Sequence, residues 1–252
     1  MARLLGHALI VVLLTLTTQI GGVLWLLSRL TPKYKTLSFA ALYLAVTLCL
    51  PFVAPRWGRV ALPCTGDTLR SQSLFYCALN RHYVTPEMAK TVHDLANKMS
   101  TQFPNQSVQT LDGNFPLPID FPLLPHLSHS DGRKIDLALF YKTPETHAPT
   151  DDTRSPIGYF AFEDGPTPCP HNQRLSLRWD FEWLQPYFKT LPLDKARTRA
   201  ALNILADDPR VEKIFVEPHL KKVIGVSHAK MRFQGCRAAR HDDHIHFQTQ
   251  SP

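Results

Sequence analysis

Hydrophobic positions are concentrated in the first quarter of the chain, where two long stretches contain no charged residue. Residues 4–28 form the first stretch and residues 36–54 the second. A helix needs about 20 apolar residues to cross the hydrocarbon core of a bilayer, and both stretches are near that length. The pattern predicts a hairpin of two transmembrane helices, followed by a short tether at residues 55–63. A cleaved signal peptide followed by one anchor helix is the alternative.

Basic residues indicate the orientation of this hairpin. The connection between its helices holds Arg29, Lys33 and Lys35, and an excess of positive charge favours the cytoplasmic side of a membrane. The N-terminus and everything after Arg56 are therefore expected outside the cytoplasm, although basic residues at the two outer ends oppose this orientation. Both alternatives export the remainder of the chain, so we expect a membrane anchor at residues 1–59 and an exported domain at residues 60–252.

The exported part mixes helical and strand patterns. A helix is predicted from Thr85, which can cap it, to the residue before Pro104, and another at 194–206. A helical turn is predicted at 218–223. Strands are predicted at 107–111, 134–141, 159–162, 213–216 and 241–247, and irregular loops at 115–125, 143–154 and 165–172. Because strands and helices do not alternate regularly, we expect an α+β fold with a mostly antiparallel sheet and flanking helices.

Net charge argues against a nucleic-acid partner. The chain has 28 Lys and Arg against 21 Asp and Glu. Six of the basic residues and none of the acidic ones lie in residues 1–60, which leaves 22 basic against 21 acidic residues in the remainder. The excess of positive charge therefore belongs to the anchor, and the domain has no basic surplus with which to bind nucleic acid.

Cysteine positions fit an oxidising compartment. Cys49 lies inside the second apolar stretch, whereas Cys64, Cys77, Cys169 and Cys236 all lie in the exported part. An even number without a metal-type C-x-x-C pair predicts two disulfides, with three possible connectivities. Four free thiols in a cytosolic domain are the alternative.

Histidines gather in two distant runs that also contain carboxylates. His126 and His129 precede the strand 134–141, in which Asp136 points away from the apolar face formed by Ile135 and Leu137. Gly132 permits a turn that brings His129 back beside Asp136. The second run, HDDHIHF, contains His241, His244 and His246, and the last two face one way on a strand.

Two imidazoles and one carboxylate suit a catalytic zinc ion. A structural zinc site uses four protein ligands, whereas a catalytic one uses three and leaves a position for water, whose pKa the metal lowers. If the two strands are neighbours, His129, Asp136, His244 and His246 converge. One imidazole more than the ligands require is then available to act on the reacting group.

These runs are similar to those of the metallopeptidase family typified by lysostaphin, the D-Ala-D-Ala carboxypeptidases and the hedgehog signalling domain. That family is marked by H-x(6)-D and a later H-x-H, the spacing of His129 with Asp136 and of His244 with His246. The chain most resembles the penicillin-insensitive murein endopeptidases, which have two further histidines, at the positions of His126 and His241. The resemblance covers the motif-bearing half of the chain and excludes the membrane segment.

The resemblance implies roles for individual residues. His129, Asp136 and His246 would bind Zn²⁺, with His126 as a further candidate ligand, and one or two ions are compatible with this set. His244 would be the general base or would stabilise the oxyanion, and His241 would assist it. Asp243 stands where the family's carboxypeptidases have Glu, so this shorter carboxylate is a rival base.

The function implied is zinc-dependent hydrolysis of amide bonds in peptidoglycan peptides, with a murein endopeptidase favoured. The enzyme would sit in the bacterial inner membrane with its domain in the periplasm or outside. A D,D-carboxypeptidase of the same fold is one alternative. The other is a non-catalytic zinc-binding module that recognises cell-wall peptide or a protein partner; such a module would not need His244. Arg81 and Tyr83 are expected to pack, with a substrate carboxylate as an alternative partner for them.

Overall fold

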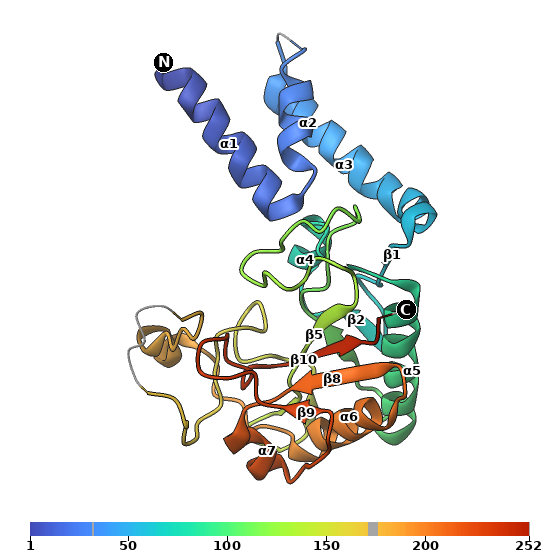
Figure 1. The fold of residues 1–252 in the computed structure, drawn as a ribbon, viewed down its shortest axis with the longest axis vertical. Helices are drawn as coiled ribbons and strands as arrows, with labels where there is room; N and C mark the ends of the chain where they lie inside the picture. Colours follow the sequence, from blue (N-terminus) through green and yellow to red (C-terminus); the bar gives the residue numbers. More distant parts are fainter. Residues whose placement is uncertain (32, 171–175, 252) are drawn as a thin grey trace.

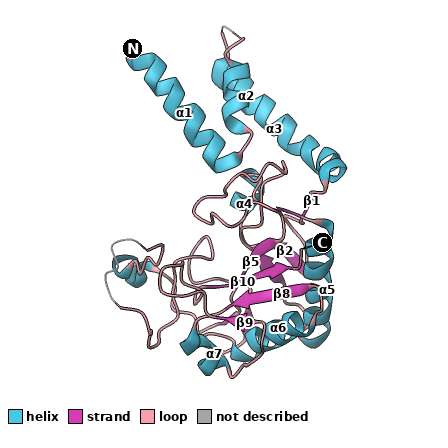
Figure 2. Cartoon of the chain, in the orientation of Figure 1, coloured by secondary structure: helices cyan, strands magenta, loops and turns pink. Residues whose placement is uncertain are grey.

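The computed structural model describes residues 1–31, 33–170 and 176–251. Three N-terminal helices stand at one end of an α+β domain, and both parts are seen in Figures 1 and 2. The predicted α+β class of the domain is thereby confirmed.

A six-stranded sheet in the order β2-β4-β5-β10-β8-β9 forms the centre of the domain. The three inner pairings, β4 with β5, β5 with β10 and β10 with β8, are antiparallel, and the two edge pairings are parallel. The sheet is therefore mixed. Its strands are β2 (Leu69–Ser71), β4 (Val108–Thr110), β5 (Lys134–Ala138), β8 (Val211–Phe215), β9 (Met231–Arg232) and β10 (His244–Thr249).

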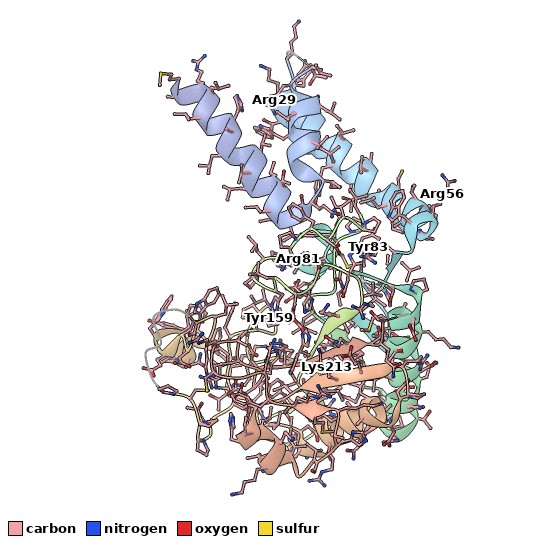
Figure 3. All side chains as sticks on the ribbon, in the orientation of Figure 1. Arg29, Arg56, Arg81, Tyr83, Tyr159 and Lys213 are labelled. Atoms are coloured by element: carbon pink, nitrogen blue, oxygen red, sulfur yellow. A yellow bond between two sulfur atoms is a disulfide. The ribbon has the colours of Figure 1, made fainter. Side chains whose placement is uncertain are left out.

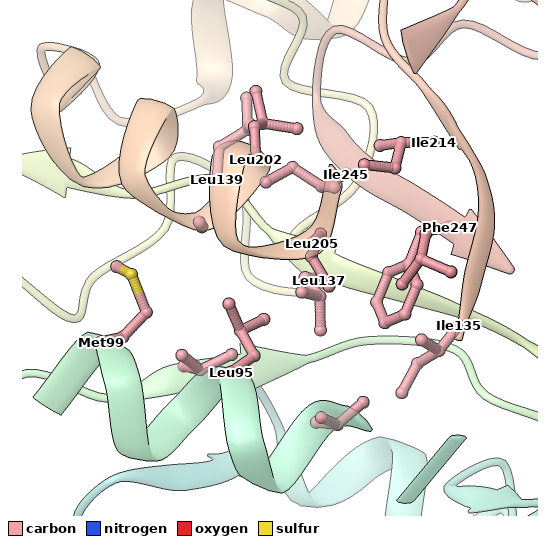
Figure 4. Close-up of a cluster of buried hydrophobic side chains, with 14 of the residues drawn as sticks. Leu95, Met99, Ile135, Leu137, Leu139, Leu202, Leu205, Ile214, Ile245 and Phe247 are labelled. Carbon is pink, nitrogen blue, oxygen red and sulfur yellow. The ribbon is translucent and has the colours of Figure 1, made fainter. Parts of the chain in front are cut away.

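Helices cover one face of this sheet. Helix α5 (Pro86–Gln102) begins after Thr85, whose hydroxyl accepts from the backbone N–H of Met88, and α6 (Lys195–Asp207) begins after Asp194 in the same way. Leucines of both helices pack against Ile135, Leu137, Ile245 and Phe247 of the central strands, as Figure 4 shows. A shorter helix, α7 (Pro218–Ile224), completes the layer. All three were predicted from the sequence at nearly these bounds.

The opposite face of the central strands carries the polar residues. Ile135 and Leu137 are buried in the core, and the alternation of a strand turns Asp136 to the other face. This face is covered by loops rather than helices (Figure 2). His129, His244 and His246 lie near Asp136 on it. The core therefore fixes where Asp136 points.

Several local predictions are wrong. Residues 159–162 form no strand, and the last strand begins at His244 rather than at residue 241. Short elements without a periodic pattern were missed, including α4 (Leu74–Ala78), η2 (Glu182–Tyr187) and the strand pair β6 (Tyr141–Lys142) with β7 (Pro149–Thr150). The predicted loop at 165–172 is irregular up to residue 170; its last two residues lie outside the described part of the chain.

The N-terminal segment differs from the predicted hairpin. Residues 4–28 form two helices, α1 (Ala2–Thr18) and α2 (Gly21–Ser28), because the chain reverses at Gln19, whose φ is 66°. Gly22 allows α2 to lie close to α1, since a Cβ there would stand 2.6 Å from the carbonyl oxygen of Val11. In Figure 1 the N-terminus and the connection before α3 lie at the same end of the molecule, whereas the predicted hairpin separates them.

Among the described residues, the segment Lys35–Trp57 is long and apolar enough to cross a membrane by length and composition. It comprises α3 (Lys35–Val53) and the 3-10 helix η1 (Ala54–Trp57). The predicted tether at 55–63 is wrong, because this segment is ordered against the domain: β1 (Val60–Ala61) pairs with β3 (Tyr83–Val84), and the indole N–H of Trp57 donates to the carbonyl of Pro116 at 2.7 Å.

Two disulfides are present, as predicted, and the structure selects their pairing. Cys64 is bonded to Cys77 and Cys169 to Cys236. Cys49 is free and exposed on α3. Disulfides form and persist mainly in oxidising compartments.

Candidate metal centre and groove

The pairing of β5 with β10 brings the two histidine-containing runs together. Asp136 lies opposite His246 in the antiparallel register, and Nδ1 of His246 is 2.7 Å from Oδ1 of Asp136. His244, two residues earlier on β10, faces the same side, with Nε2 at 3.7 Å from the same carboxylate oxygen. Both histidines are almost fully buried.

His129 reaches this point from the loop before β5. Gly132, with φ of 80°, makes the predicted turn, and its N–H donates to the side chain of Asn114. Nδ1 of His129 lies 2.8 Å from the carbonyl oxygen of Gly113 and therefore donates to it, which leaves Nε2 free to accept or to bind a metal. Nε2 stands 3.2 Å from Nδ1 of His246 and 3.6 Å from Oδ1 of Asp136.

His126 lies on the other side of the same carboxylate. Its Nδ1 is 3.3 Å from Oδ2 of Asp136 and its Nε2 is 3.6 Å from Oδ2 of Asp112. Ligand atoms of His126, His129 and Asp136 all lie within 4.8 Å of one another, which makes them a group able to hold a metal ion. The candidate ligands predicted from the sequence are thus brought together by the fold.

Burial sets the protonation states of this cluster. It lowers the pKa of His126 to about 4 and that of His129 to about 3, despite the nearby Asp136, so both imidazoles are neutral at pH 7. Burial by itself raises the pKa of Asp136, but the surrounding imidazoles outweigh it and hold this pKa well below its usual value. Neutral imidazoles and an ionised carboxylate are the forms that bind a metal.

His244 is oriented by its neighbour in sequence. Its Nδ1 lies 2.5 Å from Oδ1 of Asp243, whose second oxygen accepts from the backbone N–H of Phe160 at 2.6 Å. Burial lowers the pKa of His244, but Asp243 and Asp136 together outweigh burial and raise it to about 9. Nε2 of His244 is buried and has no hydrogen-bond partner among the described residues.

His241 borders the cluster without entering it. Its ring centre is 5.0 Å from that of His244 and 5.5 Å from that of His246, and its Nδ1 has no partner among the described residues. The backbone N–H of His241 donates to Glu217, which fixes the start of this run.

Tyr159 was missed from the sequence. Its hydroxyl donates to Oδ2 of Asp136 at 2.6 Å and accepts from the backbone N–H of Asp112 at 3.1 Å. Burial raises the pKa of Tyr159 well above its usual value, so it remains a donor. Nothing local distinguishes Tyr159 from a core tyrosine; it was predicted only as the start of a strand.

Arg81 is also part of this network, rather than free for a substrate. Its guanidinium donates to both oxygens of Asp112, at 2.6 and 2.8 Å, and to the carbonyl of Leu124. Figure 3 shows Arg81 on the side of the N-terminal helices and Tyr159 nearer the sheet. The expectation that Arg81 packs is confirmed, and Tyr83 is likewise buried.

A groove of about 200 Å³ opens onto the cluster. His126, His244 and His246 lie at its base, and its walls are mainly apolar. The walls comprise Pro125, Leu127, Tyr159, Phe160, Phe162, Leu177 and Trp179. The single Lys or Arg among the described residues that line it, Arg240, is bound to Asp180 and Asp242. The groove therefore presents mainly apolar side chains, and no unpaired Lys or Arg among its described residues, beside the cluster.

A second group with metal-ligand atoms consists of Cys64, Cys77 and His82. Its two sulfurs are joined in a disulfide, so they are not available as thiolates.

Compared with models of protein families and with curated protein sequences, the chain has no significant match.

Proposed function

We propose that the chain is a zinc-dependent peptidase that hydrolyses amide bonds in peptidoglycan peptides. The observation that carries this proposal is the convergence of three donor atoms, from His129, Asp136 and His246, beside a further buried imidazole nitrogen without a partner, that of His244. A catalytic zinc site has three protein ligands and needs a further group to act on the substrate, a place that His244 can fill.

The donor set fits zinc. A tetrahedral zinc ion with bonds of about 2.0–2.1 Å holds its ligands about 3.3 Å apart. The three donor atoms are separated by 3.2, 2.7 and 3.6 Å, so small side-chain adjustments suffice. The hydrogen bonds from His129 to Gly113 and from Tyr159 to Asp136 are the kind of outer contacts that orient metal ligands.

The bound ion would supply a water of lowered pKa and polarise the substrate carbonyl. Side chains of the protein supply the proton transfer and the positioning that the reaction also needs. Nε2 of His244 is placed to donate a proton or a hydrogen bond to the oxyanion at the reacting centre, because the raised pKa of about 9 keeps the ring protonated and Nδ1 is committed to Asp243. Asp243 then acts through His244 as a positioning residue, because both of its oxygens are occupied. His241 packs against the rings of His244 and His246.

The residues that line the groove favour cleavage of an internal bond of the peptide over cleavage at its carboxyl end. A carboxypeptidase needs a cation to bind the terminal carboxylate of its substrate, and Arg240, in the groove, is already paired with two carboxylates. We therefore propose an endopeptidase in preference to a D,D-carboxypeptidase.

The proposed location is the bacterial inner membrane, with the domain in the periplasm. Helix α3 is the membrane segment, and the basic residues at and just before its start, Arg29, Lys33 and Lys35, favour a cytoplasmic start. The two disulfides support an external domain. In this arrangement Arg3 joins the cytoplasmic charges, because the N-terminus lies at the same end as the connection (Figure 1).

The test is incubation of the full chain in detergent with purified cross-linked muropeptides, with and without a chelator, followed by mass analysis of the products. We expect cleavage that the chelator stops and added zinc restores. His93→Ala, which changes an exposed histidine on α5, serves as the matched control and should cleave normally. Zinc and peptide binding without any product would instead support the non-catalytic module.

A further inference from the structure

Large apolar side chains are exposed on the end of the domain that faces the N-terminal helices. On α4, Leu74 is 64% and Phe75 46% exposed; on the loop 117–127, Ile119 is 60% and Leu127 53% exposed. We call these four residues the α4–loop surface. In Figure 1, α4 and this loop lie directly beneath α1 and α3. Clustered exposed apolar groups of this size mark a surface that contacts something else.

The same two segments are bound to the anchor helices by hydrogen bonds. The side chain of Gln19, at the reversal between α1 and α2, exchanges two bonds with the backbone of Leu117, at 3.2 and 2.9 Å. Tyr43 on α3 donates to the carbonyl of Ala78, the last residue of α4, at 2.7 Å. The side chain of Asn80 donates to Tyr43 and Thr47. The domain is thus fixed to the helices at several points.

These contacts occur far along α3. At about 1.5 Å per residue, Tyr43 stands about 12 Å from the start of α3 and Thr47 about 18 Å. The side chains that hold α4 therefore come from the middle of the apolar segment, so α4 lies beside the membrane helix itself and not at the end of a tether. Near the end of this segment, Leu50 of α3 and Ala54 of η1 are buried in one cluster with Tyr83 of the domain.

We propose that the α4–loop surface contacts the lipid bilayer, so that the domain rests against the membrane instead of hanging from a tether. The proposal depends on the membrane location proposed for α3. Continuity with α3 identifies the partner as lipid, because the helix and the surface form one apolar end of the molecule. The charged Asp120 beside the exposed Ile119 indicates the headgroup boundary rather than the hydrocarbon interior.

This contact determines where the groove opens. Pro125 and Leu127 belong both to the loop 117–127 and to the wall of the groove. The groove therefore lies at the margin of the lipid-contacting surface, and peptides held near the membrane are the ones within its reach.

The experiment uses the full chain in vesicles of phosphatidylcholine and phosphatidylglycerol, with and without a spin-labelled lipid that quenches fluorescence near the headgroups. An environment-sensitive dye is attached to Phe75→Cys or Ile119→Cys in a Cys49→Ser background. The matched control is Val223→Cys, an equally exposed apolar position on α7 at 44%. A fourth sample carries the dye on the natural Cys49, which is exposed on α3.

We expect quenching of about twofold at positions 75 and 119, as for side chains buried about 5–10 Å into the boundary region, and little at position 223. Quenching at Cys49 but no more at 75 and 119 than at 223 would overturn the proposed contact and leave the anchor intact. Absence of quenching at Cys49 as well would overturn the anchor, and the contact with it.

Discussion

Oδ1 of Asp136 lies 2.7 Å from Nδ1 of His246, although 110 residues separate the two in the chain. They are direct partners in the antiparallel register of β5 and β10. The alternation of both strands turns both side chains away from the core, and the proposed metal centre depends on this one pairing.

Removing either partner should release the metal. Asp136→Asn keeps the shape of the side chain but not its charge, and His246→Ala removes a donor atom outright. We expect both purified variants to contain less than about a tenth of the wild-type zinc and to be inactive, because each leaves only two of three ligands. Metal content is measured by mass spectrometry of the digested protein. Full zinc occupancy in either variant would contradict the assignment of that residue as a ligand.

His244→Ala should separate metal binding from activity. Its Nε2 is 3.7 Å from Asp136 and is not one of the three proposed donors. We expect normal zinc content and a loss of hydrolysis of about 10²–10⁴-fold, the usual contribution of a positioned acid or base. Asp243→Asn should keep zinc and lose less activity, since it acts through His244. Loss of zinc in His244→Ala equal to that in the ligand variants would refute this division of roles.

Tyr159→Phe tests the outer contact of the metal ligand. The substitution removes the hydroxyl that donates to Oδ2 of Asp136 and leaves the ring in place. Loss of such contacts typically lowers metal affinity about 10–100-fold. Zinc affinity is measured by competition with a chromophoric chelator, with Tyr187→Phe, at an exposed tyrosine, as the control. Unchanged affinity in Tyr159→Phe would assign this hydroxyl to packing alone.

His82 should make the stability of the fold depend on pH. Burial lowers its pKa from 6.5 to about 4 in the folded state. As the pH falls from 6.5 towards 4, the unfolded chain binds a proton that the folded chain does not, so the free energy of unfolding decreases. Between pH 7 and pH 4.5, His82 alone should lower the free energy of unfolding by about 2 kcal/mol.

The measurement is denaturant unfolding of the full chain in detergent with its disulfides intact. His82→Gln cannot titrate and should lose that part of the pH dependence, whatever its stability at pH 7. The exposed His93→Ala should keep the dependence of the wild type. If the free energy of unfolding depends on pH in the same way in His82→Gln and in the wild type, His82 is not the source of the pH dependence.

The local sequence pattern was sufficient to predict those elements whose conformation depends on residues close in sequence. The caps at Thr85 and Asp194, the apolar stripes of α5 and α6, and the alternation that separates Asp136 from Ile135 and Leu137 were all readable, because helix and strand periodicity act over a few residues. The spacing of His244 and His246 also predicted that both face one way, since residues two apart on a strand share a face. Their approach to Asp136 depended on the pairing of two distant strands.

Only the tertiary structure decided the contacts between distant segments. The hydroxyl of Tyr159 on Asp136, the Arg81 pair with Asp112 and the choice among three disulfide connectivities all join residues that no local pattern relates. The break at Gln19 is of the same kind: an uncharged stretch is compatible with one helix or two, and the bonds between Gln19 and Leu117, 98 residues away, accompany the reversal. Hydrophobicity determines that a segment leaves water, whereas side-chain partners determine where it turns.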